Sequence, residues 1–145
     1  MIAIARARPS DEEAIRDLLR ASGLPTEDLA AGSFDRFLAA RSEGTVVGAA
    51  GFETYGAIAM VRSLAVSPEC RKQGVASKLL SAAEQHAASD GADTLFGLTV
   101  TAEAFLAKRG YERIERLDAP DEIRRTAEFT GLCPESAVLM RKILD

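Results

Sequence analysis

The fold is decided by one stretch of the sequence, 61-VRSLAVSPECRKQGVASKLL-80. The apolar residues up to Val66 predict a strand, and the apolar spacing from Val75 onward predicts the first turns of a helix. Between them lies a loop that carries Arg71, Lys72 and Gly74. Backbone N–H groups and two cations at the start of a helix form a favourable site for an anion. The stretch therefore predicts a bound pyrophosphate and, with it, a nucleotide-derived cofactor.

The composition is typical of a globular protein with one core. The chain has 145 residues, of which 47% are hydrophobic and 28% are charged, and this length suffices to bury a core without metals or disulfides. The net charge of −4 argues against a general nucleic-acid-binding surface. No apolar run approaches the ~20 residues of a membrane span, and the N-terminus lacks a signal-peptide pattern. We expect a single domain over residues 1–145, a cytoplasmic location and no metal site, since Cys70 and Cys133 fit no metal-binding spacing.

Hydrophobic periodicity and turn residues predict alternating strands and helices along the chain. The first helix is expected to start with Ser10 as its N-cap, with Glu13 completing a capping box, and to end at Gly23. A loop over residues 24–29 then leads into a short second helix. Strands are predicted at residues 1–8, 37–41, 45–53, 58–66, 94–99, 111–117 and 136–143, and further helices at 74–90, 102–109 and 121–129. This order predicts an α+β (α/β) fold with one mixed, mostly antiparallel sheet of about seven strands flanked by helices.

The order of elements around the Arg-x-x-Gly-x-Ala loop resembles the GNAT family of N-acetyltransferases, and the resemblance covers nearly the whole chain. In that family the loop wraps the pyrophosphate of acetyl-CoA. The resemblance assigns this role to Arg71, Gly74 and Ala76, with Lys72 beside them and the backbone N–H groups of Gln73, Val75 and Ser77 as donors. It also implies that a bulge splays the preceding strand. The pantetheine arm of the cofactor would then pair with the backbone around Leu64, Ala65 and Val66.

A second segment, 103-EAFLAKRGY-111, resembles the family motif in which a short helix and a Gly-aromatic pair flank the coenzyme thiol. Many relatives have a tyrosine in this helix that protonates the departing thiolate, but the matching position here is Leu106. Tyr55 is then a candidate acid, and unassisted departure of the thiolate is the alternative. Glu53, at the end of its predicted strand, is a candidate general base that acts directly or through water. The alternative for Glu53 is a solvated carboxylate at a strand end.

Two finer resemblances bear on the acceptor. The RSLAV strand is similar to that of short glutamate N-acetyltransferases, and the tail 119–137 is similar to acetyltransferases associated with arsenic-resistance operons. In the glutamate enzymes a basic residue of this strand binds the substrate carboxylate, which implies that role for Arg62; the alternative is a salt bridge to a structural carboxylate. Arg124 and Cys133 are further candidate acceptor contacts, with a solvated helix face and a buried small side chain as the alternatives.

These observations predict an acetyl-CoA-dependent N-acetyltransferase. Its acceptor would be a small amine bearing a carboxylate, an amino acid or an analogue, which attacks the thioester directly in a ternary complex. The partners expected are this small molecule and no nucleic acid or membrane, and a homodimer is left open. A non-catalytic acyl-CoA-binding or sensing module is the alternative, favoured by the leucine at position 106.

Overall fold

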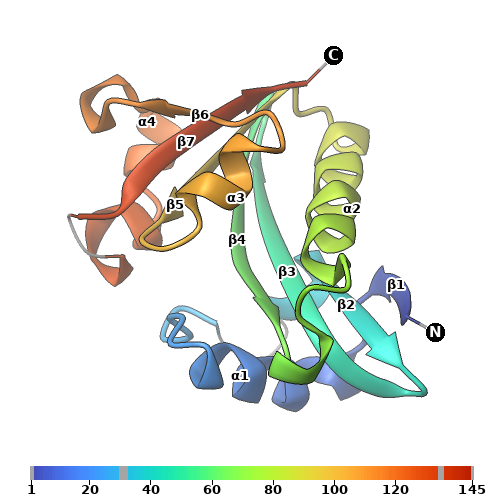
Figure 1. The fold of residues 1–145 in the computed structure, drawn as a ribbon. Helices are drawn as coiled ribbons and strands as arrows, with labels where there is room; N and C mark the ends of the chain where they lie inside the picture. Colours follow the sequence, from blue (N-terminus) through green and yellow to red (C-terminus); the bar gives the residue numbers. More distant parts are fainter. Residues whose placement is uncertain (1, 30–32, 134–135, 145) are drawn as a thin grey trace. The chain divides into compact units, whose positions relative to one another are not determined.

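A computed structural model describes residues 2–29, 33–133 and 136–144 of the chain (Figure 1). In chain order these residues form β1 (Ile2–Arg6), α1 (Glu12–Ala21), β2 (Phe37–Ser42), β3 (Thr45–Tyr55), β4 (Ile58–Val66), α2 (Val75–Ser89), β5 (Thr94–Thr99), α3 (Glu103–Ala107), β6 (Glu112–Ile114), α4 (Asp121–Arg124) and β7 (Val138–Ile143). The strands make one seven-stranded sheet in the order β1-β2-β3-β4-β5-β7-β6. β4 and β5 are parallel, whereas β1–β2, β2–β3, β5–β7 and β6–β7 are antiparallel. The predicted α+β class, with a mixed and mostly antiparallel sheet, is confirmed.

The contacts of the chain divide it into two compact units. The first comprises Met1–Glu53 and Val61–His86, and the second comprises Thr54–Met60 and Ala87–Asp145. The boundaries fall inside β3, β4 and α2, so each of these three elements contributes to both units. A single domain over residues 1–145 stays a prediction.

In the first unit, helices pack on both faces of the hairpin of β2 and β3. Ala49 of β3 belongs to a buried cluster with Ile15 and Leu19 of α1. The preceding residue, Gly48, faces the opposite side because side chains alternate along a strand. There, Leu79 of α2 would lie only 2.9 Å from a Cβ placed on Gly48. Small residues in β3 therefore allow a helix to approach the strand closely.

The first helix begins differently from the prediction. Pro9 opens a 3-10 turn over Pro9–Asp11, and α1 follows it directly. The Asp11 carboxylate accepts the backbone N–H of Arg8 at 2.7 Å and also pairs with the guanidinium of Arg41. Proline is favoured at a first helical position, and the side chain two residues later can then reach back to the cap. Arg8 therefore holds the N-cap position predicted for Ser10, and Asp11 is the acidic residue that reaches back to it, the role predicted for Glu13.

Strand β4 is irregular in its second half. Ser63 has a φ of 57°, a left-handed conformation that is uncommon for a residue other than glycine. Burial accordingly does not alternate, since Arg62 is buried, Leu64 is half-buried and its two successors are both buried. The described register with β5 joins Ile58–Met60 to Thr94–Phe96. The irregular residue lies in the strand in which the family resemblance implied a bulge.

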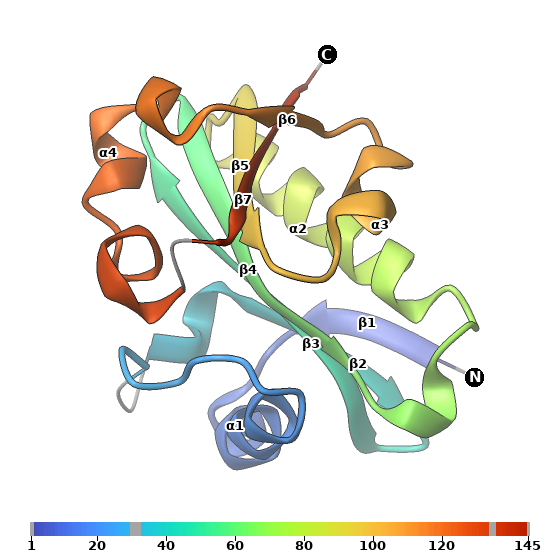
Figure 2. The same cartoon turned by 60° about the vertical axis from the view of Figure 1, so that its left-hand side comes forward.

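The second unit is built around β5 and β7, which pair along the full length of both strands. Met60, Phe96 and Leu139 form a buried cluster with Ile123 of α4. Helix α3 packs against β6 and β7, and Figure 2 shows α3 and α4 on opposite sides of β7. None of the described helices is both long and apolar enough to cross a bilayer.

The later elements are shorter than predicted. The helix expected over residues 121–129 ends at Arg124, and a π-helical turn follows at Glu128–Leu132. Thr126 explains the break, because its hydroxyl donates to the carbonyl of Ile123 at 2.7 Å and accepts the N–H of Phe129 at 3.2 Å. The short second helix expected after residue 29 is a 3-10 turn at Ser33–Arg36, and residues 30–32 lie outside those described.

Candidate functional site

The predicted phosphate loop lies in the first unit, at the N-terminal end of α2. Lys72 and Gly74 both have left-handed backbones, with φ of 67° and 79°. The Arg71 side chain donates through Nε to the carbonyl of Val66 at 3.1 Å, and this ties the loop to the end of β4. The amides that head α2 have no acceptor within their own helix, and the positive end of the helix dipole lies there. The loop is exposed, so a bound anion can reach these amides from solvent.

Gly74 leaves open space at the point where a phosphate would approach. A Cβ placed on this residue would meet no atom within 4 Å. The residues present therefore fit a pyrophosphate, because they offer donors, a helix terminus and room for close approach to the backbone.

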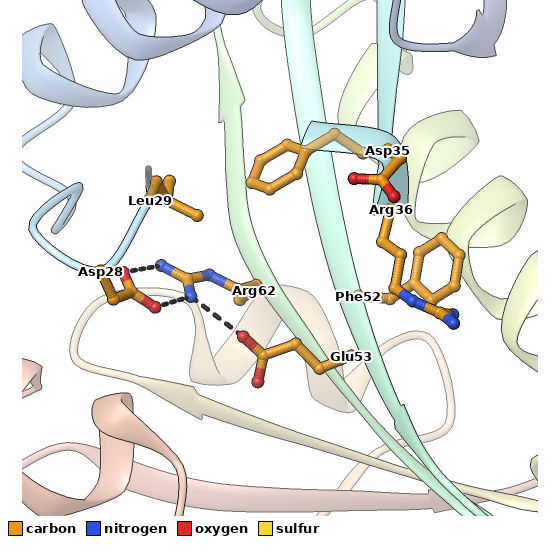
Figure 3. A pocket seen from close by; sticks show the side chains of 8 residues that line it. Asp28, Leu29, Asp35, Arg36, Phe52, Glu53 and Arg62 are labelled. Carbon is orange, nitrogen blue, oxygen red and sulfur yellow. Dashed lines mark hydrogen bonds and ion pairs between the residues drawn. The ribbon is translucent and has the colours of Figure 1, made fainter. Parts of the chain in front are cut away.

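A cavity of about 210 Å³ lies in the same unit (Figure 3). Its lining comes from the loop after α1, the turn before β2, and strands β2, β3 and β4; the residues are Asp28, Leu29, Asp35, Arg36, Phe37, Phe52, Glu53 and Arg62. Two residues singled out from the sequence, Glu53 and Arg62, thus lie together, although they are nine positions apart. They are close because β3 and β4 are neighbouring strands of the sheet.

The Arg62 guanidinium is held by two carboxylates. Nη1 and Nη2 each donate to one oxygen of Asp28, the second at 3.0 Å, and Nη1 also donates to Oε2 of Glu53 at 3.1 Å. Nε donates to the hydroxyl of Ser63 at 3.0 Å. Figure 3 shows both carboxylates turned toward the guanidinium. This bidentate geometry with Asp28 is the strongest form of an arginine–carboxylate pair.

The three side chains differ in their exposure to solvent. The Arg62 side chain is 4% exposed, while those of Asp28 and Glu53 are 23% and 28% exposed. A buried cation is costly unless it is paired, so the carboxylates keep the guanidinium in place. Their remaining surface faces the cavity, where a ligand can reach them. The salt bridge considered as the alternative for Arg62 is thus present.

Charge in the cavity is nearly balanced but acidic overall. The lining residues carry three carboxylates, of Asp28, Asp35 and Glu53, and two guanidinium groups, of Arg36 and Arg62. Arg36 lies over the ring of Phe52, with 5.9 Å between its Cζ atom and the ring centroid. The lining therefore offers an apolar wall, one buried cation and an excess of negative charge, a combination that suits a small charged molecule with an amine.

The other predicted site residues belong to the second unit. Tyr55 ends β3 and is half-buried. Arg124 is exposed and donates through Nε to the carbonyl of Ala119 at 3.0 Å, so it braces its own loop. Cys133 is a half-buried thiol that follows the π-helical turn. Leu106, the position that the family resemblance matched to a catalytic tyrosine, is 6% exposed in α3. The catalytic roles of Glu53 and Tyr55 and the acceptor roles of Arg62, Arg124 and Cys133 stay predictions.

The loop, the irregular strand before it and the helix after it match a known family. The model of the Acetyltransferase (GNAT) family matches residues 5–115 of the chain. The chain belongs to the GNAT acetyltransferase family. Among curated proteins, an uncharacterized N-acetyltransferase of Chlorobaculum tepidum is 33% identical over 90 residues, which are 61% of this chain and 57% of that protein.

Solved structures of GNAT-type proteins share the fold. The N-acetylglutamate synthase from Neisseria gonorrhoeae, complexed with coenzyme A and N-acetyl-glutamate, is similar with a TM-score of 0.87 and 21% identity, covering 100% of this chain and 35% of that one. The protein Rv2747 of Mycobacterium tuberculosis, solved in complex with CoA, has a TM-score of 0.83 and 23% identity, covering 99% of both chains. The chain therefore spans about a third of the synthase and somewhat over half of the curated relative. At these identities the structures share the fold with this chain.

Sequence reasoning did not single out Asp28. This residue lies in the irregular segment after α1, 34 positions before its partner Arg62. A loop without periodicity gives no indication of which carboxylate will pair with a buried arginine. The one available signal was the arginine itself, since a charge within an apolar strand requires a partner somewhere in the chain.

Proposed function

We propose that this chain is an acetyl-CoA-dependent N-acetyltransferase that acetylates a small amine bearing a carboxylate. The observation that carries the proposal is the exposed loop at the start of α2, with left-handed Lys72 and Gly74. Family membership supports the same ligand, and similar structures were solved with coenzyme A. The cytoplasmic location, the homodimer and the absence of nucleic-acid binding stay predictions.

The cofactor site we propose runs from β4 to α2. Arg71, Lys72 and the amides from Gln73 to Ser77 would hold the pyrophosphate. The pantetheine arm would lie along Leu64 to Val66, next to the left-handed Ser63. A backbone N–H near Leu64 would polarise the thioester carbonyl as negative charge develops on its oxygen.

The chemistry is one acyl transfer. The amine nitrogen attacks the thioester carbonyl carbon, the N–C bond forms, the C–S bond breaks, and the coenzyme A thiolate leaves. Glu53, directly or through water, takes the proton lost from nitrogen. Tyr55 is the proposed donor of a proton to the thiolate, and a thiol pKa near ~8.5 also allows the thiolate to leave unassisted.

The acceptor pocket we propose is the cavity between Asp28, Phe52, Glu53 and Arg62. Its carboxylates would attract the ammonium form of the acceptor and its guanidinium would bind the acceptor carboxylate. Arg124 and Cys133 are proposed as further acceptor contacts.

Two measurements test this function. Isothermal titration should detect acetyl-CoA binding at micromolar concentrations, and a screen of amino acids and simple amines should find acetyl-CoA-dependent thiol release with at least one of them. Absence of acetyl-CoA binding would falsify the proposal as a whole.

A non-catalytic acyl-CoA-binding module is the second candidate, favoured by buried Leu106 in place of the usual tyrosine. This module would also bind acetyl-CoA, but it would release no thiol with any amine. Binding of acetyl-CoA without thiol release for any amine in the screen would support the module and exclude the transferase.

A further inference from the structure

The salt bridge of Arg62 already contains a carboxylate where the acceptor carboxylate would be expected. Asp28 uses both of its oxygens on Nη1 and Nη2 of Arg62. This two-point geometry is the one that a guanidinium offers to any planar carboxylate, including that of an amino acid. An acceptor that binds Arg62 in this way must take the place of Asp28.

We infer that Asp28 is a specificity-determining residue, an internal competitor that the carboxylate of an α-amino acid displaces from Arg62. The inference rests on the proposed function and assigns its acceptor class. Asp28 keeps the buried guanidinium paired while no acceptor is bound, because an unpaired buried cation would be strongly destabilising.

The elements that carry the three side chains differ in how readily they can move. Arg62 and Glu53 belong to β4 and β3, two neighbouring strands of the sheet. Asp28 belongs to a loop outside the helices and strands, where the N–H of Leu29 donates to the carbonyl of Thr26 at 3.0 Å. Local opening of a loop costs less free energy than opening of a strand inside a sheet. The exchange therefore moves Asp28 and leaves Arg62 and Glu53 where they are.

Glu53 is placed to bind the ammonium group of an α-amino acid whose carboxylate has replaced Asp28. Asp28 and Glu53 accept hydrogen bonds from the same nitrogen of Arg62, Nη1. A carboxylate that replaces Asp28 therefore has an oxygen adjacent to Glu53. An α-amino acid carries its nitrogen one carbon away from its carboxylate, so the ammonium group falls beside the Glu53 carboxylate, which is 28% exposed. One molecule can thus satisfy both charges.

Asp28→Asn provides the first test, because the amide has nearly the shape of the carboxylate and lacks its charge. Titration calorimetry without acetyl-CoA should give tighter binding of α-amino acids to the variant, by about tenfold, since they no longer displace a charged partner. Binding of the matching amino acid amides, which lack the carboxylate, should change by less than about twofold.

Asp35→Asn is the matched control for charge alone. Asp35 lines the same cavity, and Figure 3 places its carboxylate apart from the Arg62 guanidinium. This variant removes the same unit of negative charge from the cavity and leaves the Asp28–Arg62 salt bridge intact. Its effect on amino acid affinity therefore measures the contribution of cavity charge alone. The gain in affinity from Asp28→Asn should exceed the gain from Asp35→Asn clearly.

Asp28→Ala gives a second readout that does not require a fully stable variant. Removing the whole side chain should lower the melting temperature, and added amino acids should raise it again by a larger shift than in the wild type. Amino acid amides should restore much less. A larger rise in melting temperature with amino acids than with their amides would show that a carboxylate binds where the Asp28 carboxylate was removed.

The outcomes separate this inference from the proposed function. Weaker binding of amino acids to Asp28→Asn, an equal gain for the amides, or no binding of any amino acid to either protein would each overturn the exchange. Thiol release with simple amines alone would keep the transferase and reject the exchange. Tighter amino acid binding without any thiol release would keep the exchange and reject the transferase.

Discussion

At Gly74, both the backbone conformation and the proposed phosphate favour a residue without a side chain. Its φ is 79°, and a side chain there would extend into open space where the phosphate is proposed to bind. Gly74→Leu should weaken acetyl-CoA binding by about a hundredfold, as expected for the loss of roughly two charge-assisted hydrogen bonds. Titration calorimetry measures this change.

Gly23→Leu is the control for backbone strain. Gly23, at the end of α1, has a φ of 73° and equally open surroundings. Both leucines should lower the free energy of unfolding by a similar amount, about 1–2 kcal/mol. If Gly23→Leu weakened acetyl-CoA binding as much as Gly74→Leu did, the loop would not be the phosphate site.

Glu53 is proposed as the residue that takes the proton from the attacking amine. Glu53→Gln should lower kcat by about a hundredfold with a smaller change in the acceptor KM. Without the base only the neutral amine reacts, so kcat/KM of the variant should rise about tenfold per pH unit until the pKa of the acceptor amine is reached. A kcat close to that of the wild type would leave Glu53 as a partner of Arg62 alone.

The contrast between Arg62 and Asp28 indicates how far sequence reasoning reaches at single residues. Arg62 could be singled out because a charge in an apolar strand is exceptional. Asp28 is one of 22 acidic residues, and nothing local distinguishes it. The pairing depends on the tertiary packing that brings Asp28, in the segment after α1, to Arg62 of β4.

At the level of elements, a buried ion pair links the turn before α1 to β2. Asp11 and Arg41 are 10% and 11% exposed in their side chains, and Asp11 also accepts the N–H of Arg8. Asp11→Ala leaves a nearly buried guanidinium without this partner and removes the cap. Urea unfolding should show a loss of about 3 kcal/mol.

Asp17→Ala, in the helix α1 that follows this turn, is the matched control. Asp17 pairs with Arg20 at the surface, where the two side chains are 70% and 61% exposed. Its loss should change the free energy of unfolding by less than about 0.5 kcal/mol. Equal effects of the two substitutions would show that burial of the Asp11 pair contributes little.

The bounds of elements were predictable where packing and local pattern agree. β4 and β5 have the predicted residues, 58–66 and 94–99, because mostly apolar segments bounded by turns leave little choice. β6 has only three residues, since a 3-10 turn at Arg116–Asp118 ends the run. The start of the first helix was misplaced because Pro9 opens a 3-10 turn ahead of Ser10, and the Asp11 carboxylate, which also pairs with Arg41, reaches back to Arg8.

For the whole molecule, three shared elements should couple the two compact units. β3, β4 and α2 each run through both, so unfolding of one unit removes part of an element from the other. Differential scanning calorimetry should therefore give one transition, with equal calorimetric and van't Hoff enthalpies. Two separable transitions would contradict the prediction of a single domain over residues 1–145.

The buried guanidinium of Arg62 also makes the site visible to spectroscopy. A side chain clamped by Asp28 and Glu53 cannot rotate freely about its Cζ–N bonds, so its protons exchange slowly and resonate apart from those of solvated arginines. Nitrogen-edited NMR spectra can therefore follow these signals during a titration of unlabelled compounds. The NMR signals of the Arg62 guanidinium can thus be used to screen for acceptors before any turnover assay exists.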